Sequence, residues 1–218
     1  MMKRKTSIAA AITLAIVAVI AGMLLSRALL RPADDARAAA LSTGTLLEPA
    51  RPLPAFSLVD HEGKPYDRDR LANQWTFLFF GFTNCPDVCP MTLRMLSSVE
   101  QSLSDLPAEQ RPHVILVSVD PKRDTPEQLA SYVKYFSDSF AGITGEQAAL
   151  DEFTRNLGVP VVITETGDGG YTVDHSATIF LINPQAELRA LFSPPHAPSA
   201  IAADYRRIVG APDTRNDG

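Results

Sequence analysis

Two apolar runs in the middle of the chain predict strands that are buried on both faces. Trp75–Phe80 and Val114–Val119 consist almost entirely of aromatic and aliphatic residues, which is typical of strands covered on both sides. Shorter runs predict further strands at Phe56–Val59, Val159–Thr164, Ala177–Ile182 and Glu187–Phe192. Asn183–Ala186 joins the last two as a hairpin turn, although we would expect a glycine near its end.

Apolar residues at helical spacing predict helices between these strands. One begins near Pro90, and the next has a complete start, with Thr125 as cap, Pro126 at the first helical position and Gln128 three residues after the cap. A third ends at Gly158 and a fourth closes the domain. Their apolar faces consist of Leu93, Leu96, Val99 and Leu103; Leu129, Tyr132, Val133 and Phe136; Leu150, Phe153 and Leu157; and Ile201, Tyr205 and Ile208. The order β-α-β-α-α-β-β-α predicts an α/β domain, and its final hairpin and helix are typical of a thioredoxin-like fold.

The N-terminus predicts a membrane anchor. Thr6–Ser26 is a stretch of 21 residues without a charge, and a helix of that length spans the roughly 30 Å hydrocarbon core of a bilayer. Lys3, Arg4 and Lys5 precede it, so the positive-inside rule places this end in the cytoplasm. We therefore expect residues 1–27 to form a cytoplasmic N-terminus and one inner-membrane helix, with the following chain in the periplasm. The alternative is a signal peptide cleaved near Ala28, although signal h-regions are usually shorter, at about 7–15 residues.

The remaining chain divides into a tether, one domain and a tail. Residues 28–54 are rich in alanine, proline and small polar residues and predict a tether, 55–210 the α/β domain, and 211–218 a C-terminal tail. Residues 1–31 carry five lysines and arginines and no acidic residue. The other residues hold 15 basic against 25 acidic side chains, a net charge of −10. Such a charge argues against a nucleic-acid partner.

Both cysteines of the chain, Cys85 and Cys89, lie where the buried strand gives way to a helix. A four-residue offset on a helical turn places two side chains on one face, with Cβ atoms about 5–6 Å apart. The pair can therefore share a metal ion, close a disulfide, or exchange between these states. We expect the helix N-terminus to lower the thiol pKa, and soft thiolates select soft ions such as Cu(I). A structural zinc would usually need four ligands, and a structural disulfide around so small a loop would stabilise the fold little.

Four histidines could supply a third, neutral ligand. His61 lies in an early turn, His113 at a strand start and His196 in a proline-rich segment, so exposed or structural roles are favoured for these three. His175 differs, because it precedes the strand Ala177–Ile182 at the expected edge of the site. From position alone, a lone histidine here is more often structural than a ligand.

Three motifs in the same order resemble the Sco (SenC) proteins, which are membrane-tethered copper chaperones of cytochrome c oxidase assembly. They are Thr83-Asn84-Cys85-Pro86-Asp87-Val88-Cys89-Pro90, Val119-Asp120-Pro121-Lys122-Arg123-Asp124-Thr125-Pro126, and Asp174-His175-Ser176. The resemblance extends from about residue 56 to residue 208 and implies a thioredoxin-like fold. It also implies a Cu(I) or Cu(II) site formed by Cys85, Cys89 and His175. The implied partners are a cytochrome c oxidase subunit and another copper chaperone.

Two acidic residues flank the candidate ligands. Asp87 and Asp174 could orient Cys85, Cys89 or His175 by hydrogen bonding. Each also has a local explanation, Asp87 as a helix-start acceptor and Asp174 as a turn residue. The segment Asp120–Thr125 is explained by a strand end and a helix cap, so we do not count its residues among the ligands.

The sequence favours a copper metallochaperone, which is not an enzyme, and leaves one main alternative. In that alternative the protein is a thiol-disulfide oxidoreductase that reduces the cysteines of the oxidase copper site. Cys85 would attack the target disulfide and Cys89 would resolve the mixed disulfide. The C-x-x-x-C spacing and the lack of any need for His175 count against it. A peroxidase of the peroxiredoxin type shares the fold and would have to turn over peroxide.

Overall fold

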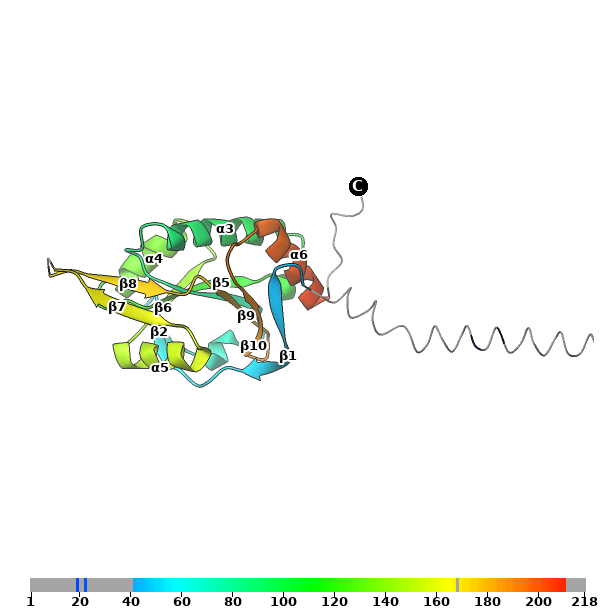
Figure 1. The fold of residues 1–218 in the computed structure, drawn as a ribbon, viewed down its shortest axis with the longest axis horizontal. Coiled ribbons are helices and arrows are strands. Elements are labelled where there is room, and N and C mark those ends of the chain that lie inside the picture. Colours follow the sequence, from blue (N-terminus) through cyan, green and yellow to red (C-terminus); the bar gives the residue numbers. More distant parts are fainter. Residues whose placement is uncertain (1–18, 20–21, 23–40, 168, 211–218) are drawn as a thin grey trace, which may run out of the picture. The chain divides into compact units, whose positions relative to one another are not determined.

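The computed structural model describes Val19, Gly22, residues 41–167 and residues 169–210 (Figure 1). Its compact unit begins at Leu41. Among the described residues, no helix combines the length and the apolar character needed to cross a membrane. The anchor expected over residues 1–27 lies outside the described part of the chain, apart from Val19 and Gly22, and so does the tail expected over 211–218.

Ten strands, four helices and two short 3₁₀ turns make up the described domain. The strands are β1 Gly44–Pro52, β2 Ser57–Asp60, β3 Pro65–Asp67, β4 Thr76–Gly81, β5 His113–Ser118, β6 Ala141–Thr144, β7 Val161–Glu165, β8 Tyr171–His175, β9 Ile179–Ile182 and β10 Glu187–Phe192. The helices are α3 Val88–Ser102, α4 Pro126–Lys134, α5 Gln147–Leu157 and α6 Pro198–Val209, and the 3₁₀ turns are Arg68–Leu71 and Ala108–Gln110.

Eight of these strands form one mixed sheet. Their order is β1-β10-β9-β4-β5-β6-β2-β3, and β7 and β8 form a separate two-stranded sheet. The centre, β4-β5-β6, is parallel, whereas β9, β10 and β1 add antiparallel on one side and β2 and β3 on the other. The prediction of an α/β domain with a central mixed sheet is therefore confirmed.

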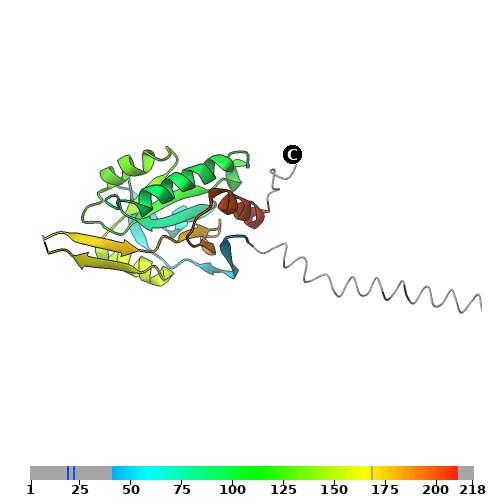
Figure 2. The same cartoon turned by 45° about the horizontal axis from the view of Figure 1, so that its top comes forward.

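Strand β4 lies in the middle of the sheet because helices cover both of its faces. All six of its residues are buried. Phe77 contacts Tyr205 of α6, with ring centroids 5.4 Å apart, and Phe80 contacts Phe153 of α5, with centroids 5.7 Å apart. Since successive side chains of a strand point to opposite faces, α6 and α5 must lie on opposite sides. Figures 1 and 2 show α3, α4 and α6 on one side of the sheet and α5 on the other.

The predicted start of α4 and the predicted end of α5 have the expected geometry. Thr125 and Gln128 form a reciprocal capping box at the start of α4, and Gly158 ends α5 with φ 71°. The hairpin between β9 and β10 ends at Ala186, which adopts φ 56° where we expected a glycine. The side-chain oxygen of Asn183 accepts hydrogen bonds from the backbone N–H groups of Gln185 and Glu187, which holds the turn in place.

The tether expected over residues 28–54 has to be shortened. Residues 44–52 form β1, which pairs antiparallel with β10 at the edge of the main sheet. The buried carboxylate of Asp204 in α6 accepts hydrogen bonds from the backbone N–H groups of Ser42, Thr43 and Gly44, at 2.7, 2.8 and 3.0 Å. The domain therefore includes residues before 55, because both the sheet and α6 hold this segment.

Candidate metal centre

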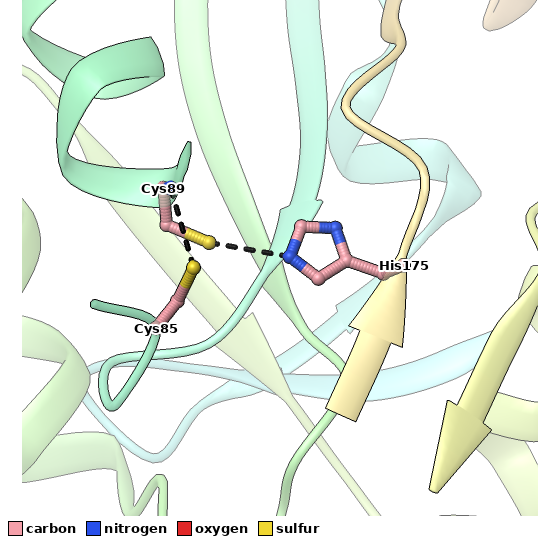
Figure 3. A group of neighbouring side chains, drawn as sticks. All are labelled: Cys85, Cys89 and His175. Atoms are coloured by element: carbon pink, nitrogen blue, oxygen red, sulfur yellow. Dashed lines mark hydrogen bonds between the residues drawn. The ribbon is translucent and has the colours of Figure 1, made fainter. Parts of the chain in front are cut away.

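The two cysteines and His175 lie together at the carboxyl end of β4. Cys85 comes from the loop after β4, Cys89 from the first turn of α3 and His175 from the last residue of β8. Their sulfur atoms and one ring nitrogen of His175 all lie within 4.8 Å of one another, which is close enough for a shared metal ion (Figure 3). Of the described residues, no other group of three such side chains is arranged in this way.

The turn from β4 into α3 brings the two sulfurs together. The backbone N–H of Cys85 donates to the carbonyl of Phe82 at 3.3 Å. The backbone N–H of Cys89 donates to Cys85 Sγ at 3.4 Å. Cys89 is fully buried and Cys85 is partly exposed. Both thiols are free, so one sulfur is reachable from solvent and the other is held beneath it.

A backbone carbonyl sets the orientation of His175. Its Nε2 lies 3.3 Å from Cys89 Sγ, and its Nδ1 lies 3.0 Å from the carbonyl oxygen of Ser176. Because a carbonyl can only accept a hydrogen bond, Nδ1 carries the proton and Nε2 keeps its lone pair for the sulfur side. The rings of Phe79 and Phe82 meet the imidazole edge-on, at 6.0 and 5.8 Å between centroids. His175 therefore presents the nitrogen that a metal ligand needs.

Burial shifts the pKa of two of the three groups. Burial lowers the pKa of His175 below its usual value, although the Ser176 carbonyl and the charge of Asp174 oppose this effect. Burial raises the pKa of the Cys89 thiol well above its usual value. Our expectation that the helix N-terminus favours thiolate is therefore wrong for Cys89, because loss of hydration outweighs the helix end. A bound cation would supply the nearby positive charge that stabilises a buried thiolate.

Asp87 and Asp174, the two acidic residues predicted to orient the ligands, lie beside the cluster and are exposed. Asp87 occupies the cap position of α3, but its side chain accepts no hydrogen bond from the helix, so the helix-start explanation is wrong. Asp174 lies in β8, where it pairs with Val162 of β7. The prediction that Asp174 is a turn residue is therefore wrong. Among the described residues, neither carboxylate hydrogen-bonds Cys85, Cys89 or His175. That either one orients the ligands stays a prediction.

The other histidines lie outside the cluster. His61 Nδ1 accepts a hydrogen bond from the backbone N–H of Gly142 at 3.1 Å, and His113 is exposed at the start of β5. His196 Nε2 donates to the carbonyl of Ala177 at 2.8 Å, which ties down the chain just after His175. Their exposed or structural roles agree with the sequence-based expectation.

A cleft of about 410 Å³ opens beside the cluster. The loop after β4 forms one wall, with Phe82 and Cys85, and β8 forms the other, with Val173 and His175. Arg123, which follows β5, also lines it. Arg123 was not among the residues predicted for the site, although it lies within the motif Val119–Pro126. The cleft gives solvent and partners access to one cysteine and to the histidine.

The fold and this cluster together define a thioredoxin-like domain with a candidate centre of two cysteines and one histidine. The chain belongs to the SCO1/SenC family, whose sequence pattern matches residues 45–210. It is 40% identical over 146 residues to a Stutzerimonas stutzeri protein named for copper binding, which covers 66% of this chain and 70% of that protein. It is 37% identical over 152 residues to the human mitochondrial protein SCO1 homolog, which covers 68% of this chain and only 50% of that protein. The fold also matches the crystal structure of Arabidopsis thaliana ScoI with copper bound, with a TM-score of 0.67 and 31% sequence identity. The match covers 72% of this chain and 98% of that chain.

Proposed function

We propose that this protein is a copper metallochaperone that carries one copper ion on Cys85, Cys89 and His175. The observation that carries the proposal is the meeting of two sulfurs and one nitrogen within 4.8 Å of one another. Two thiolates and one neutral imidazole form a soft donor set, which favours Cu(I) over hard cations. Copper is the cargo of this reaction and its release is part of the function. The relatives named for copper support the choice of metal.

The arrangement of the three groups suits a metal that must be both held and handed over. Cys89 is buried and would keep its bond to copper longest. Cys85 and His175 line the cleft, so a donor atom of the partner can approach copper there and displace them one at a time. Binding requires the Cys89 thiol to lose its proton, and burial makes this costly without a cation. The buried thiol therefore favours the loaded state over an empty thiolate.

The location and the recipient of copper rest on the sequence. We propose that residues 1–27 anchor the chain in the inner membrane and that the domain works in the periplasm. The recipient would be a subunit of cytochrome c oxidase during assembly of its copper site. A phosphatase fused after residue 218 tests the topology, because it is active only in the periplasm. Activity of a fusion that lacks residues 6–26 would contradict the anchor as the exporting segment.

A copper titration tests the proposed function. The full-length chain, with both thiols reduced, is titrated with Cu(I) against a competing chelator, together with Cys85→Ser, Cys89→Ser and His175→Ala. We expect one equivalent for the unmodified chain and at least a tenfold loss of affinity for each variant. His113→Ala is the matched control, since His113 is exposed and lies outside the cluster. Failure to bind one equivalent, or unchanged affinity in His175→Ala, would refute the proposal.

The alternative is a thiol-disulfide oxidoreductase acting on the cysteines of the oxidase copper site. One observation favours it, namely that the more exposed thiol, Cys85, precedes the buried one, Cys89, as an attacking and a resolving cysteine would. The thiolate of Cys85 would attack one sulfur of the target disulfide, and Cys89 would then displace the target's thiol and leave a Cys85–Cys89 disulfide. Cys89→Ser should trap a mixed disulfide with the target, and His175→Ala should exchange at the unmodified rate. Absence of a trapped partner would exclude this alternative.

A further inference from the structure

The connection between β5 and α4 contacts both halves of the metal centre. It runs from Ser118, the last residue of β5, to Thr125, the cap of α4. We call residues 118–125 the brace segment. Its sequence suggested only a strand end and a helix cap, yet its side chains reach the loop of Cys85 and the strand of His175.

The first contact holds the loop that carries Cys85. Asp124 is only 1% exposed. Its carboxylate accepts hydrogen bonds from the Thr83 hydroxyl at 2.5 Å, the Thr83 backbone N–H at 3.1 Å and the Ser118 hydroxyl at 2.6 Å. Thr83 lies two residues before Cys85. One buried carboxylate thus fixes the start of the cysteine loop to the end of β5.

The second contact holds the strand that carries His175. The hydroxyl of Tyr171 donates to Asp120 at 2.6 Å, and Arg123 pairs with the other oxygen of the same carboxylate. The guanidinium of Arg123 lies 4.0 Å from the centre of the Tyr171 ring, and its Nη1 donates to the Tyr171 carbonyl at 3.4 Å. Tyr171 begins β8 and His175 ends it. The Asp120–Arg123 pair therefore binds the first residue of the strand that ends at His175.

Side-chain contacts are needed to hold strand β8 in place. Among the described residues, β7 and β8 pair only with each other. A two-stranded hairpin is marginally stable by itself, so its position depends on side-chain contacts with the main body. Arg123 supplies a further one, because its guanidinium lies 5.6 Å from the centre of the Phe82 ring, which in turn contacts His175.

We infer that Asp120, Arg123 and Tyr171 are positioning residues that hold His175 within reach of the cysteine sulfurs. This inference rests on the proposed copper function. With the contacts made, copper has three ligands. With the contacts broken, β8 moves away and copper keeps only the two sulfurs. The brace segment thus sets whether the histidine takes part in the site.

The test removes one hydroxyl group and leaves the ring in place. The full-length chain carries Tyr171→Phe, alone and combined with His175→Ala, and is titrated with Cu(I) and Cu(II) against a chelator. Tyr135→Phe is the matched control, because Tyr135 is the C-terminal cap residue of α4 and is 74% exposed. We expect Tyr171→Phe to lower copper affinity about tenfold, as loss of a group that supports a ligand typically does. We also expect the Cu(II) electron paramagnetic resonance spectrum to shift toward that of His175→Ala.

A double-mutant comparison separates positioning from general destabilisation. If Tyr171 acts through His175, Tyr171→Phe lowers affinity no further once His175 is alanine. Asp120→Asn should behave in the same way. The variant Asp60→Asn breaks the comparable pair between Asp60 of β2 and Arg70 of the following 3₁₀ turn, and should lower stability without changing the spectrum. The same loss in both backgrounds, or an unchanged affinity and spectrum in Tyr171→Phe, overturns the inference.

A measurement without copper keeps the inference separate from the proposed function. Hydrogen exchange of the β8 amides in the apo protein should become faster in Tyr171→Phe and stay unchanged in Tyr135→Phe. If the unmodified chain binds no copper, the proposed function fails. Faster exchange in Tyr171→Phe would still support the role of Tyr171 in holding β8 in place. If exchange is unchanged, the positioning role itself is wrong.

Discussion

Gly81 makes room for the sulfur of Cys89. A Cβ atom on Gly81 would lie only 2.8 Å from Cys89 Sγ, and also 3.1 Å from Leu116 Cδ1 and 3.2 Å from Phe79 Cε1. Gly81 is the last residue of β4. The end of the central strand therefore sets where the buried sulfur lies, because any side chain there would displace it.

Gly81→Ala should weaken copper binding by displacing Cys89 Sγ. We expect about a tenfold loss of Cu(I) affinity, together with about 1–3 kcal/mol of stability from overpacking. Competition with a Cu(I) chelator and urea unfolding measure the two effects. Gly142→Ala is the control, because its Cβ would lie 3.0 Å from Leu129 Cβ and crowd the core away from the cysteines. Both variants should lose stability, and equal copper affinity in both would contradict the role of Gly81.

The stability of the apo protein should fall in mild acid because of His175. Burial lowers the pKa of this histidine, so the unfolded chain binds a proton more readily than the folded one. Stability is then lost as the pH falls through about 6.5, the ordinary value for histidine, toward the lower folded value. Urea unfolding at pH 7.5 and 5.5 should show a smaller difference for His175→Gln than for the unmodified chain. An equal difference, or the same reduction in His113→Gln, would argue against His175 as the source.

Removal of the Tyr132 hydroxyl should not destabilise the protein. This hydroxyl is buried and has no hydrogen-bond partner among the described residues. Its burial therefore costs free energy that a phenylalanine would not incur. We expect Tyr132→Phe to leave the free energy of unfolding unchanged or to raise it by up to about 1 kcal/mol. Tyr205→Phe is the matched comparison, because its hydroxyl donates to the Gln110 carbonyl at 2.6 Å, and it should lose about 1 kcal/mol. Chemical unfolding of both variants decides the point.

Asp204→Asn should loosen the start of the domain. The buried carboxylate accepts from Ser42, Thr43 and Gly44, and an amide cannot accept from all of their N–H groups in the same geometry. We expect a loss of about 3 kcal/mol, with faster hydrogen exchange in β1 than in β5. Protection of β1 equal to that of the unmodified chain would show that Asp204 is dispensable.

The same carboxylate should make this contact sensitive to acid. Burial by itself would raise the pKa of Asp204, but the three backbone N–H groups hold it below its usual value. Its contribution is therefore complete above the pKa of an unfolded aspartate, about 4, and is lost as the pH falls through the lower folded value. The stability difference between the unmodified chain and Asp204→Asn should shrink below pH 4. A constant difference would contradict this account.

Local signals in the sequence were sufficient for much of the fold. The apolar runs at β4 and β5 and the capping residues of α4 act within a few residues, and each is found where expected. Strand β1 was missed because it contains Pro49 and Pro52 and few apolar residues. It exists through its pairing with β10, more than a hundred residues away. Such long-range pairing leaves little trace in a single sequence.

The residues of the candidate site could be nominated from the sequence, but their geometry and the raised pKa of Cys89 could not. The cysteine spacing and the three motifs were sufficient to nominate Cys85, Cys89 and His175. No sequence pattern indicates that the Ser176 carbonyl determines which nitrogen of His175 is protonated, since every residue has a carbonyl. The roles of Gly81 and Asp124 depend on contacts that form only after the chain has folded.

The position of β1 decides how far this protein can be shortened. Strand β10 would end the main sheet if β1 were absent, and its unpaired backbone would face solvent. An open strand edge of this kind recruits other strands and promotes aggregation. A chain that starts at residue 55 would keep the cysteines and His175 but would precipitate or assemble through β10. Residues 44–52 thus cover β10 with an edge strand that contains Pro49 and Pro52, two residues without a backbone N–H to pair with another strand.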